Sequence, residues 1–197
     1  MKKVLFTGLI LLFVGLFIAA FPTEKEGDIY TDTIRLHILA RSDSEYDQGI
    51  KLEIRDRLLL KYGSELSSYG SVTSAEKAIS TLIPEITYDV DNWLIELGCK
   101  AKCKVYLTEE WYDTREYENF IFPCGTYTSL KIVIDEGAGK NWWCVMFPPL
   151  CLDIATEKAP IDDVMIGYTE EEVTLINKTK RYNVKFKVLE IISDIFA

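Results

Sequence analysis

The sequence predicts an α+β fold: an antiparallel sheet of about four to five strands, two long helices packed on one face of it, and a C-terminal helix. Two observations lead to this prediction. Two long segments repeat apolar residues at three- and four-residue spacing, as amphipathic helices do. Several shorter segments alternate apolar and polar residues, which is typical of strands with one solvated face.

The first strand and the first long helix follow each other. Apolar side chains fall on alternate residues from Ile34 to Ala40, as a half-buried strand requires. Ser42 and Glu45 then form a capping box, and the helix should end at Gly63. Its apolar stripe should comprise Ile50, Ile54 and Leu58. Its solvated side should carry Lys51, Arg55, Asp56 and Arg57.

The second long helix is the most regular segment of the chain. Thr73 and Glu76 repeat the capping pattern. The apolar residues that follow at helical spacing are Ile79, Leu82, Ile83, Ile86, Val90, Trp93, Leu94 and Leu97. Pro84 should kink this helix because it has no amide hydrogen and its ring crowds the preceding turn. Gly98 should end the helix in the left-handed conformation.

The remaining strands are expected between residues 99 and 147. Residues 99–107 alternate as a strand with one wet face. Residues 115–122 and 126–134 flank Pro123-Cys124-Gly125 and should form a hairpin, and residues 142–147 should return against 126–134.

The C-terminal part of the chain has a weaker pattern. Residues 156–172 are acidic and should be a loop. From Tyr182 onward, the apolar spacing of Val184, Val188, Ile191, Ile192 and Ile195 favours a helix, although residues 182–188 alone would also suit a strand.

The N-terminus has the composition of an export segment. Lys2 and Lys3 precede an apolar run from Val4 to Phe21. We therefore expect residues 1–22 to be a signal peptide or an N-terminal membrane anchor, residues 23–32 a tether, and residues 33–197 a single extracytoplasmic domain. The length of the run does not distinguish cleavage from retention.

The net charge of −9 excludes some partners. An acidic surface repels nucleic acid phosphates and gains nothing from anionic lipid headgroups. We therefore expect no nucleic acid partner, and membrane contact only through the N-terminal segment.

The five cysteines of an exported chain predict at least one disulfide. Cys144 and Cys151 are the preferred pair, because Pro148 and Pro149 between them favour a chain reversal. Cys99 and Cys103 should not bond each other, since four strand residues span roughly 13 Å. The remaining Cys124 could pair with either of them or stay a buried thiol.

Catalytic and metal-binding groups are few. His37 is the only histidine, which predicts no metal site and favours a hydrogen bond at the edge of its strand. The strongest enzymatic hypothesis is an exported cell-wall hydrolase that uses Asp135 or Glu136 beside Trp142 and Trp143. Acidic residues beside glycine are also ordinary turn residues, and we favour that interpretation. No cofactor is expected.

The segment around the adjacent tryptophans is a candidate partner-binding surface. Alternation places the two indoles on opposite faces of their strand, so that one should pack in the core and the other could be exposed. Large rigid aromatic residues concentrate binding energy at protein interfaces. The candidate contact residues are Trp142, Trp143, Phe147, Pro148 and Pro149. Core packing of both tryptophans remains the alternative.

Several separated motifs between Ile34 and Cys151 resemble the stage II sporulation protein R family of endospore-forming bacteria. They are the RLH strand at residues 35–37, the SDS turn at 42–44, the Asp47-Gln48 pair, and the NWWC and PPLC pieces within residues 141–151. The chain departs from the family pattern at Arg41 and Asp135.

The resemblance implies a secreted signalling protein rather than an enzyme. Proteins of this family are made in the forespore and exported into the space between the forespore and mother-cell membranes. There they activate a membrane-embedded aspartic protease of the mother cell, so that the sigma-E precursor is processed. The resemblance supplies no catalytic residues. The motif positions expected to be structural or to make interactions are Arg35, His37, Asp43 and Asn141.

Overall fold

The computed structural model describes residues 2–20, 29–66, 68–116, 121–148, 150 and 168–177. The chain divides into two compact units, which are described separately. The first comprises Tyr30–Glu110 and Tyr127–Tyr168; the second comprises Met1–Ile29, Trp111–Thr126 and Thr169–Ala197. The prediction of a single domain from residue 33 onward stays a prediction.

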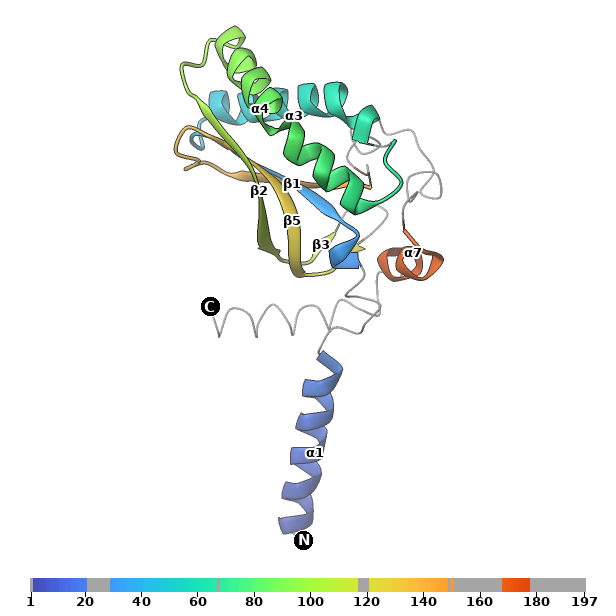
Figure 1. Cartoon of the computed structure of the whole chain (residues 1–197). Helices are drawn as coiled ribbons and strands as arrows, with labels where there is room; N and C mark the ends of the chain where they lie inside the picture. Colours follow the sequence, from blue (N-terminus) through green and yellow to red (C-terminus); the bar gives the residue numbers. More distant parts are fainter. Residues whose placement is uncertain are drawn as a thin grey trace. The chain divides into compact units, whose positions relative to one another are not determined.

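A four-stranded sheet organises the first unit, with strand order β2-β5-β1-β6 (Figure 1). The strands are β1 (Ile34–Leu39), β2 (Cys103–Tyr112), β5 (Gly125–Ile134) and β6 (Asn141–Phe147). The central strand β1 pairs antiparallel with β6 and parallel with β5. The α+β fold is thus confirmed, but the expectation of a wholly antiparallel sheet is wrong. A parallel pair needs a long crossover connection, and the helices between β1 and β5 supply one.

Two predicted strand pairings are also wrong. β6 pairs with β1, where Leu36 lies opposite Cys144, and not with β5. Residues 115–122 do not form a hairpin with 126–134. Instead β3 (Arg115–Glu116) pairs antiparallel with β4 (Ile121–Phe122) in a separate two-stranded sheet of the second unit. β1 is buried along nearly its whole length, which suits a central strand with a neighbour on each side.

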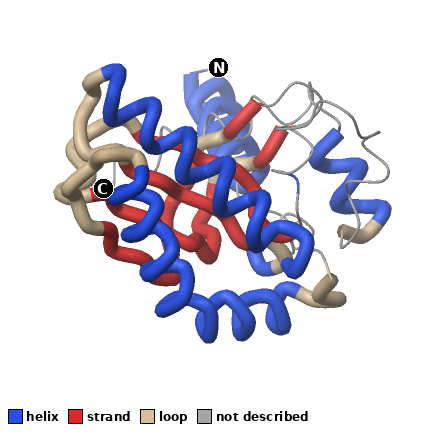
Figure 2. The backbone as a smooth tube through the Cα atoms, turned by 90° about the horizontal axis from the view of Figure 1, so that it is seen from above, coloured by secondary structure: helices blue, strands red, loops and turns tan. Residues whose placement is uncertain are grey.

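Two long helices cover one face of the four-stranded sheet. They are α3 (Glu45–Leu66) and α4 (Val72–Glu96), and Figure 2 shows both lying over the sheet. The predicted stripe of α3 is confirmed, since Ile54 and Leu58 are fully buried and Ile50 nearly so. The predicted end at Gly63 is wrong, because the helix continues to Leu66. Burial of Leu66 offsets the cost of about 1 kcal/mol for a helical glycine.

The helix starts differ slightly from the predicted capping boxes. In α3 the amide of Asp47 donates to the hydroxyl of Ser44 at 3.1 Å, so Ser44 rather than Ser42 caps the helix. In α4 the cap is Ser71, whose hydroxyl accepts from the amide of Ser74 at 3.3 Å.

The end of α4 has the predicted left-handed glycine. Gly98 has a φ of 76°, and its amide donates to the carbonyl of Ile95 at 3.0 Å. The amide of Cys99 donates to the carbonyl of Leu94 at 2.8 Å, which completes a Schellman motif. Because Cys99 is engaged in this cap, β2 begins at Cys103 and not at Cys99 as predicted.

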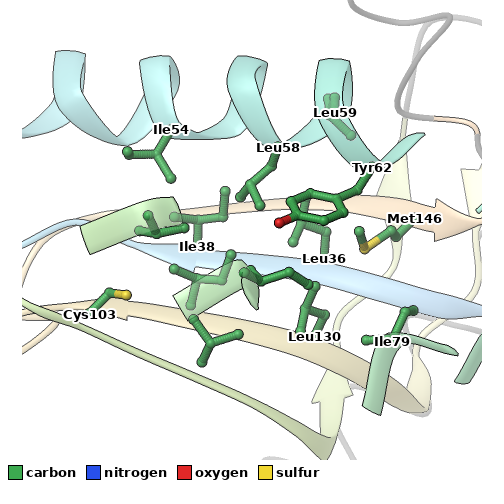
Figure 3. Close-up of a cluster of buried hydrophobic side chains, with 14 of the residues drawn as sticks. Leu36, Ile38, Ile54, Leu58, Leu59, Tyr62, Ile79, Cys103, Leu130 and Met146 are labelled. Atoms are coloured by element: carbon green, nitrogen blue, oxygen red, sulfur yellow. The ribbon is translucent and has the colours of Figure 1, made fainter. Parts of the chain in front are cut away.

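The hydrophobic core of the first unit lies between the helices and the sheet (Figure 3). Ile54 and Leu58 of α3 point toward Leu36 and Ile38 of β1, and Leu130 of β5 continues the cluster. Each such side chain contributes roughly 1.5–3 kcal/mol when fully buried. The core therefore fixes which face of β1 is turned toward the helices.

In its described residues, the second unit has two long or well-defined helices. The first is α1 (Lys2–Ala20). Among the helices in the described part of the chain, none has both the length and the apolar composition that crossing a membrane demands. The second is α7 (Glu170–Asn177), which begins inside the predicted loop 156–172. Thr169 and Glu172 form its capping box, with each side chain accepting from the other residue's amide. The helix predicted from Tyr182 onward lies outside the described residues.

Candidate interaction site

The structure brings the RLH and NWWC motifs side by side. β1 and β6 are adjacent strands in which His37 lies opposite Trp143, Ile38 opposite Trp142, and Leu39 opposite Asn141. His37 and Asn141 are 104 residues apart in the sequence. The two motifs therefore lie on neighbouring strands, an arrangement that the sequence alone does not show.

A polar network surrounds the single histidine. The Nδ1 atom of His37 lies 2.9 Å from Oε2 of Glu110, and its Nε2 atom lies 3.0 Å from Oδ1 of Asn141. The ammonium group of Lys131 donates to the other carboxylate oxygen of Glu110. We call these four residues the His37 network. They come from four strands, so His37 bonds across the sheet and not only at the edge of its own strand.

The electrostatics of the network favour an ionised carboxylate. Burial acts to raise the pKa of Glu110, but the hydrogen bonds from Lys131 and His37 outweigh it and hold that pKa below its ordinary value. Among the described residues there is no group of three or more His, Cys, Asp or Glu side chains that could hold a metal ion. The arrangement orients the imidazole ring and gives it an anionic neighbour.

The two tryptophans lie on opposite faces of β6, as alternation predicts. Trp142 packs against the hydrophobic core, and the guanidinium carbon of Arg55 lies 5.1 Å from the centre of its ring. Trp143 stacks on His37, with ring centroids 5.5 Å apart and an interplanar angle of 29°. Both indoles are half-buried. Trp143 therefore belongs to the sheet face opposite α3 and α4, next to the His37 network.

The other expected contact residues do not join this surface. Phe147 is only 4% exposed and belongs to the hydrophobic core, and Pro148 is also buried. Neither side chain is available to a partner, because both residues are buried. Pro149 lies outside the described residues.

A set of hydrogen bonds joins residues 40–51 to residues 139–141, and we call it the loop junction. The amide of Lys140 donates to Oδ1 of Asp43 at 2.7 Å. The amide of Gly139 donates to the carbonyl of Ala40 at 2.8 Å. A Cβ atom on Gly139 would lie 2.3 Å from the carbonyl oxygen of Ser42, so only glycine fits this approach. The SDS turn and the start of the NWWC motif are thus held against each other.

Lys51 is the buried cation of the loop junction. Its ammonium group donates to Oε1 of Gln48 at 2.6 Å and to the carbonyl of Lys140 at 2.9 Å. The amide group of Gln48 in turn donates to the carbonyl of Ser42 at 2.9 Å. Lys51 was expected to face water, and this expectation is wrong because protein oxygens replace its hydration. Burial lowers the pKa of Lys51.

Arg35 is the remaining motif residue with a defined place. It is fully buried, and its guanidinium carbon lies 5.3 Å from the centre of the Tyr127 ring. Arg35 and His37 alternate with the core residues Leu36 and Ile38, so they lie on the same face of β1.

The acidic pair of the hydrolase hypothesis lies in an exposed turn after β5. Asp135 has a φ of 57°, and its amide donates to the carbonyl of Lys102 at 2.8 Å. The amide of Gly137 donates to the carbonyl of Ile134 at 3.1 Å, and this hydrogen bond closes the turn. Asp135 and Glu136 are both exposed. This geometry is that of an ordinary acidic turn, and it provides no support for a pair of carboxylates enclosed around a substrate.

Three cysteines are buried thiols that form no disulfide: Cys99, Cys103 and Cys124. The prediction that Cys99 and Cys103 do not bond each other is confirmed. Of the alternatives left open for Cys124, the structure shows a buried thiol and no disulfide with Cys99 or Cys103. Burial raises the pKa of Cys103 to about 12. Cys144 is buried in β6, whereas Cys151 lies outside the described residues, so their pairing stays a prediction.

Sequence reasoning missed Glu110, Lys131, Lys51 and Gly139. The alternation of β2 could have placed Glu110 on the solvated face with Tyr106, but nothing local indicates that it reaches His37. The role of Gly139 depends on a close approach to a loop almost 100 residues earlier in the chain.

Comparison with known proteins agrees with the motifs. The family model described as stage II sporulation protein R matches residues 30–157. The stage II sporulation protein R of Bacillus subtilis (strain 168) is 33% identical over an alignment that covers 90% of this chain and 88% of that protein. No solved structure matches. This chain belongs to the stage II sporulation protein R family.

Proposed function

We propose that this protein is an exported signalling protein that activates a membrane-embedded aspartic protease of the mother cell, so that the sigma-E precursor is processed. Membership of the family gives it a role in sporulation. The export step is supported by Lys2 and Lys3 ahead of the apolar run. The protein would then act in the space between the forespore and mother-cell membranes, released or held by its N-terminal segment.

The observation that supports a contact mechanism is that the motifs meet beside Trp143. Trp143 stacks on His37, and its ring is half-buried, so part of the indole remains available. The His37 network and the loop junction hold the neighbouring strand and turn in place. A rigid aromatic group of this kind is a typical anchor of a protein interface, because little conformational entropy is lost on binding.

Activation by contact requires a difference in affinity. The protein must bind the active arrangement of the protease more tightly than the inactive one, since equal binding to both shifts nothing. A bridge between Cys144 and Cys151 would hold the end of β6 in one conformation and reduce the entropy lost on binding. We include this bridge in the proposal.

The test is to produce this chain together with the protease and the sigma-E precursor in a non-sporulating host. We expect processed sigma factor when the chain is exported. We also expect Trp143→Ala to reduce processing at least tenfold at normal protein level. Trp111→Ala is the matched control, because Trp111 of β2 is 46% exposed and lies outside the motifs. No processing with the protein demonstrably exported would refute the proposed function, and equal activity of Trp143→Ala would refute the anchor.

A further inference from the structure

A hollow of about 330 Å³ lies where α3 begins and α4 ends. Its lining residues are Glu45, Tyr46, Gly49, Ile50, Glu53 and Leu97. The hydroxyl of Tyr46 donates to the carbonyl of Leu97 at 3.0 Å and so ties the two helices together at this point. We call it the α3–α4 hollow. Figure 1 shows the two helices that form it on one side of the sheet, whereas Trp143 and His37 belong to the opposite face.

Gly49 keeps this hollow open. A Cβ atom built on Gly49 would meet nothing within 4 Å, so close packing does not require glycine there. Its backbone is helical, so a left-handed conformation does not require it either. Glycine within a helix costs roughly 1 kcal/mol relative to alanine. Because Gly49 has no side chain, it leaves space between Tyr46 and Glu53.

The chemistry of the lining favours one class of occupant. Ile50 is 5% exposed and forms an apolar floor with the partly buried Leu97, while Tyr46 is 54% exposed and provides an aromatic wall. Glu45 and Glu53 are both exposed carboxylates of the lining. Long cationic side chains bury an apolar stem and keep a charged head near water. The lining therefore suits an arginine or lysine whose stem lies on the apolar floor.

The surrounding charges leave the hollow anionic. Arg57 pairs with a carboxylate of this lining, and it bonds both Glu53 and Glu96. One positive charge therefore balances two carboxylates, and Glu45 adds a third negative charge. A cationic ligand gains from this excess, whereas an anionic ligand is repelled.

We propose that the α3–α4 hollow is a docking site for a basic peptide segment of a partner protein, in which an arginine or lysine lies beside a leucine-sized apolar side chain. The cationic head pairs with Glu45 and Glu53, and the apolar side chain rests against Ile50 and Leu97. This site is separate from the Trp143 surface, and its occupation does not depend on activation of the protease.

Peptide titration tests the proposal directly. The full chain, labelled with ¹⁵N, is titrated with an acetylated hexapeptide of alternating leucine and arginine. A second peptide has glutamate for each arginine, and a third has alanine for each leucine. We expect the first peptide to shift the amide signals of residues 45–53 and 97–98 and the other two to bind at least tenfold more weakly.

Two glycine variants separate binding from folding. Gly49→Leu fills the hollow, favours the helix and should raise the melting temperature while weakening peptide binding at least tenfold. Gly70→Leu is the matched control, because its Cβ also meets nothing within 4 Å and it lies between the two helices, away from the hollow. Glu45→Gln together with Glu53→Gln should weaken binding of the leucine–arginine peptide and should not weaken binding of the glutamate peptide, which has no cationic group to pair with either carboxylate.

Several results would overturn the proposal. They are unchanged binding by Gly49→Leu, equal binding of the glutamate peptide, signal shifts confined to other residues, and no binding of the leucine–arginine peptide at millimolar concentration. Each outcome is independent of sigma-factor processing, which is measured separately in the co-production assay.

Discussion

Gly139→Ala should destabilise the protein through the loop junction. The new Cβ atom would lie 2.3 Å from the carbonyl oxygen of Ser42 and 2.5 Å from its carbonyl carbon, and backbone atoms cannot rotate away. The turn must therefore shift, which weakens the hydrogen bonds of Gly139 to Ala40 and of Lys140 to Asp43. A neutral bond is worth about 1 kcal/mol and one to a carboxylate about 2 kcal/mol, so the expected loss is about 3 kcal/mol.

Urea unfolding followed by tryptophan fluorescence measures this change. Gly49→Ala is the matched control, because its Cβ meets nothing within 4 Å and alanine should stabilise the helix by about 1 kcal/mol. The two Gly→Ala substitutions should thus shift the free energy of unfolding in opposite directions. A loss smaller than about 1 kcal/mol for Gly139→Ala would show that the turn relaxes freely and that the loop junction is not tightly packed.

Three further predictions concern titration, thiols and catalysis. The pKa of Glu110 is lowered in the fold, so its stabilisation is complete above its ordinary value of 4.5 and is lost as the pH falls through the lowered pKa. Glu110→Gln should therefore flatten the loss of stability below about pH 4.5, and parallel curves for the two proteins would contradict this. Because burial raises the pKa of Cys103 to about 12, iodoacetamide should not label it in the folded chain. In denaturant without reductant, label on Cys144 or Cys151 would exclude their bridge. Glu136→Gln should leave sigma-factor processing unchanged, and loss of a wall-hydrolysing activity would instead support the hydrolase hypothesis.

The sequence predicted the helices well because their information is local. The stripe of Ile50, Ile54 and Leu58 and the stop at Gly98 each depend on residues within a few turns. Strand pairing was predicted poorly. The alternation of apolar and polar residues indicates which face of a strand is exposed to solvent, but it does not indicate which strand lies beside it. The crossover that makes β1 and β5 parallel depends on the whole intervening chain.

The site was predictable only in its separate pieces. His37 and the adjacent tryptophans stood out by rarity, and their faces followed from alternation. Glu110 did not stand out, because an acidic residue on a wet strand face is ordinary. The helical spacing predicts a solvent-exposed Lys51. It cannot indicate that the carbonyl of Lys140, 89 residues later in the chain, accepts a hydrogen bond from the Lys51 ammonium group.

Asn141 links the two parts of the interaction site. Its carbonyl oxygen lies 3.4 Å from the ammonium group of Lys51, and its side-chain oxygen lies 3.0 Å from Nε2 of His37. The start of α3 and the orientation of the imidazole ring are thus tied through one residue. A partner that displaced Trp143 would also have to move the imidazole ring of His37, which stacks on it. Because Asn141 contacts both His37 and Lys51, this movement would also disturb the loop junction. Interactions of this kind hold the surface around Trp143 in one arrangement before binding. Little free energy is then lost in ordering this protein, so more of the binding free energy can favour one conformation of the partner.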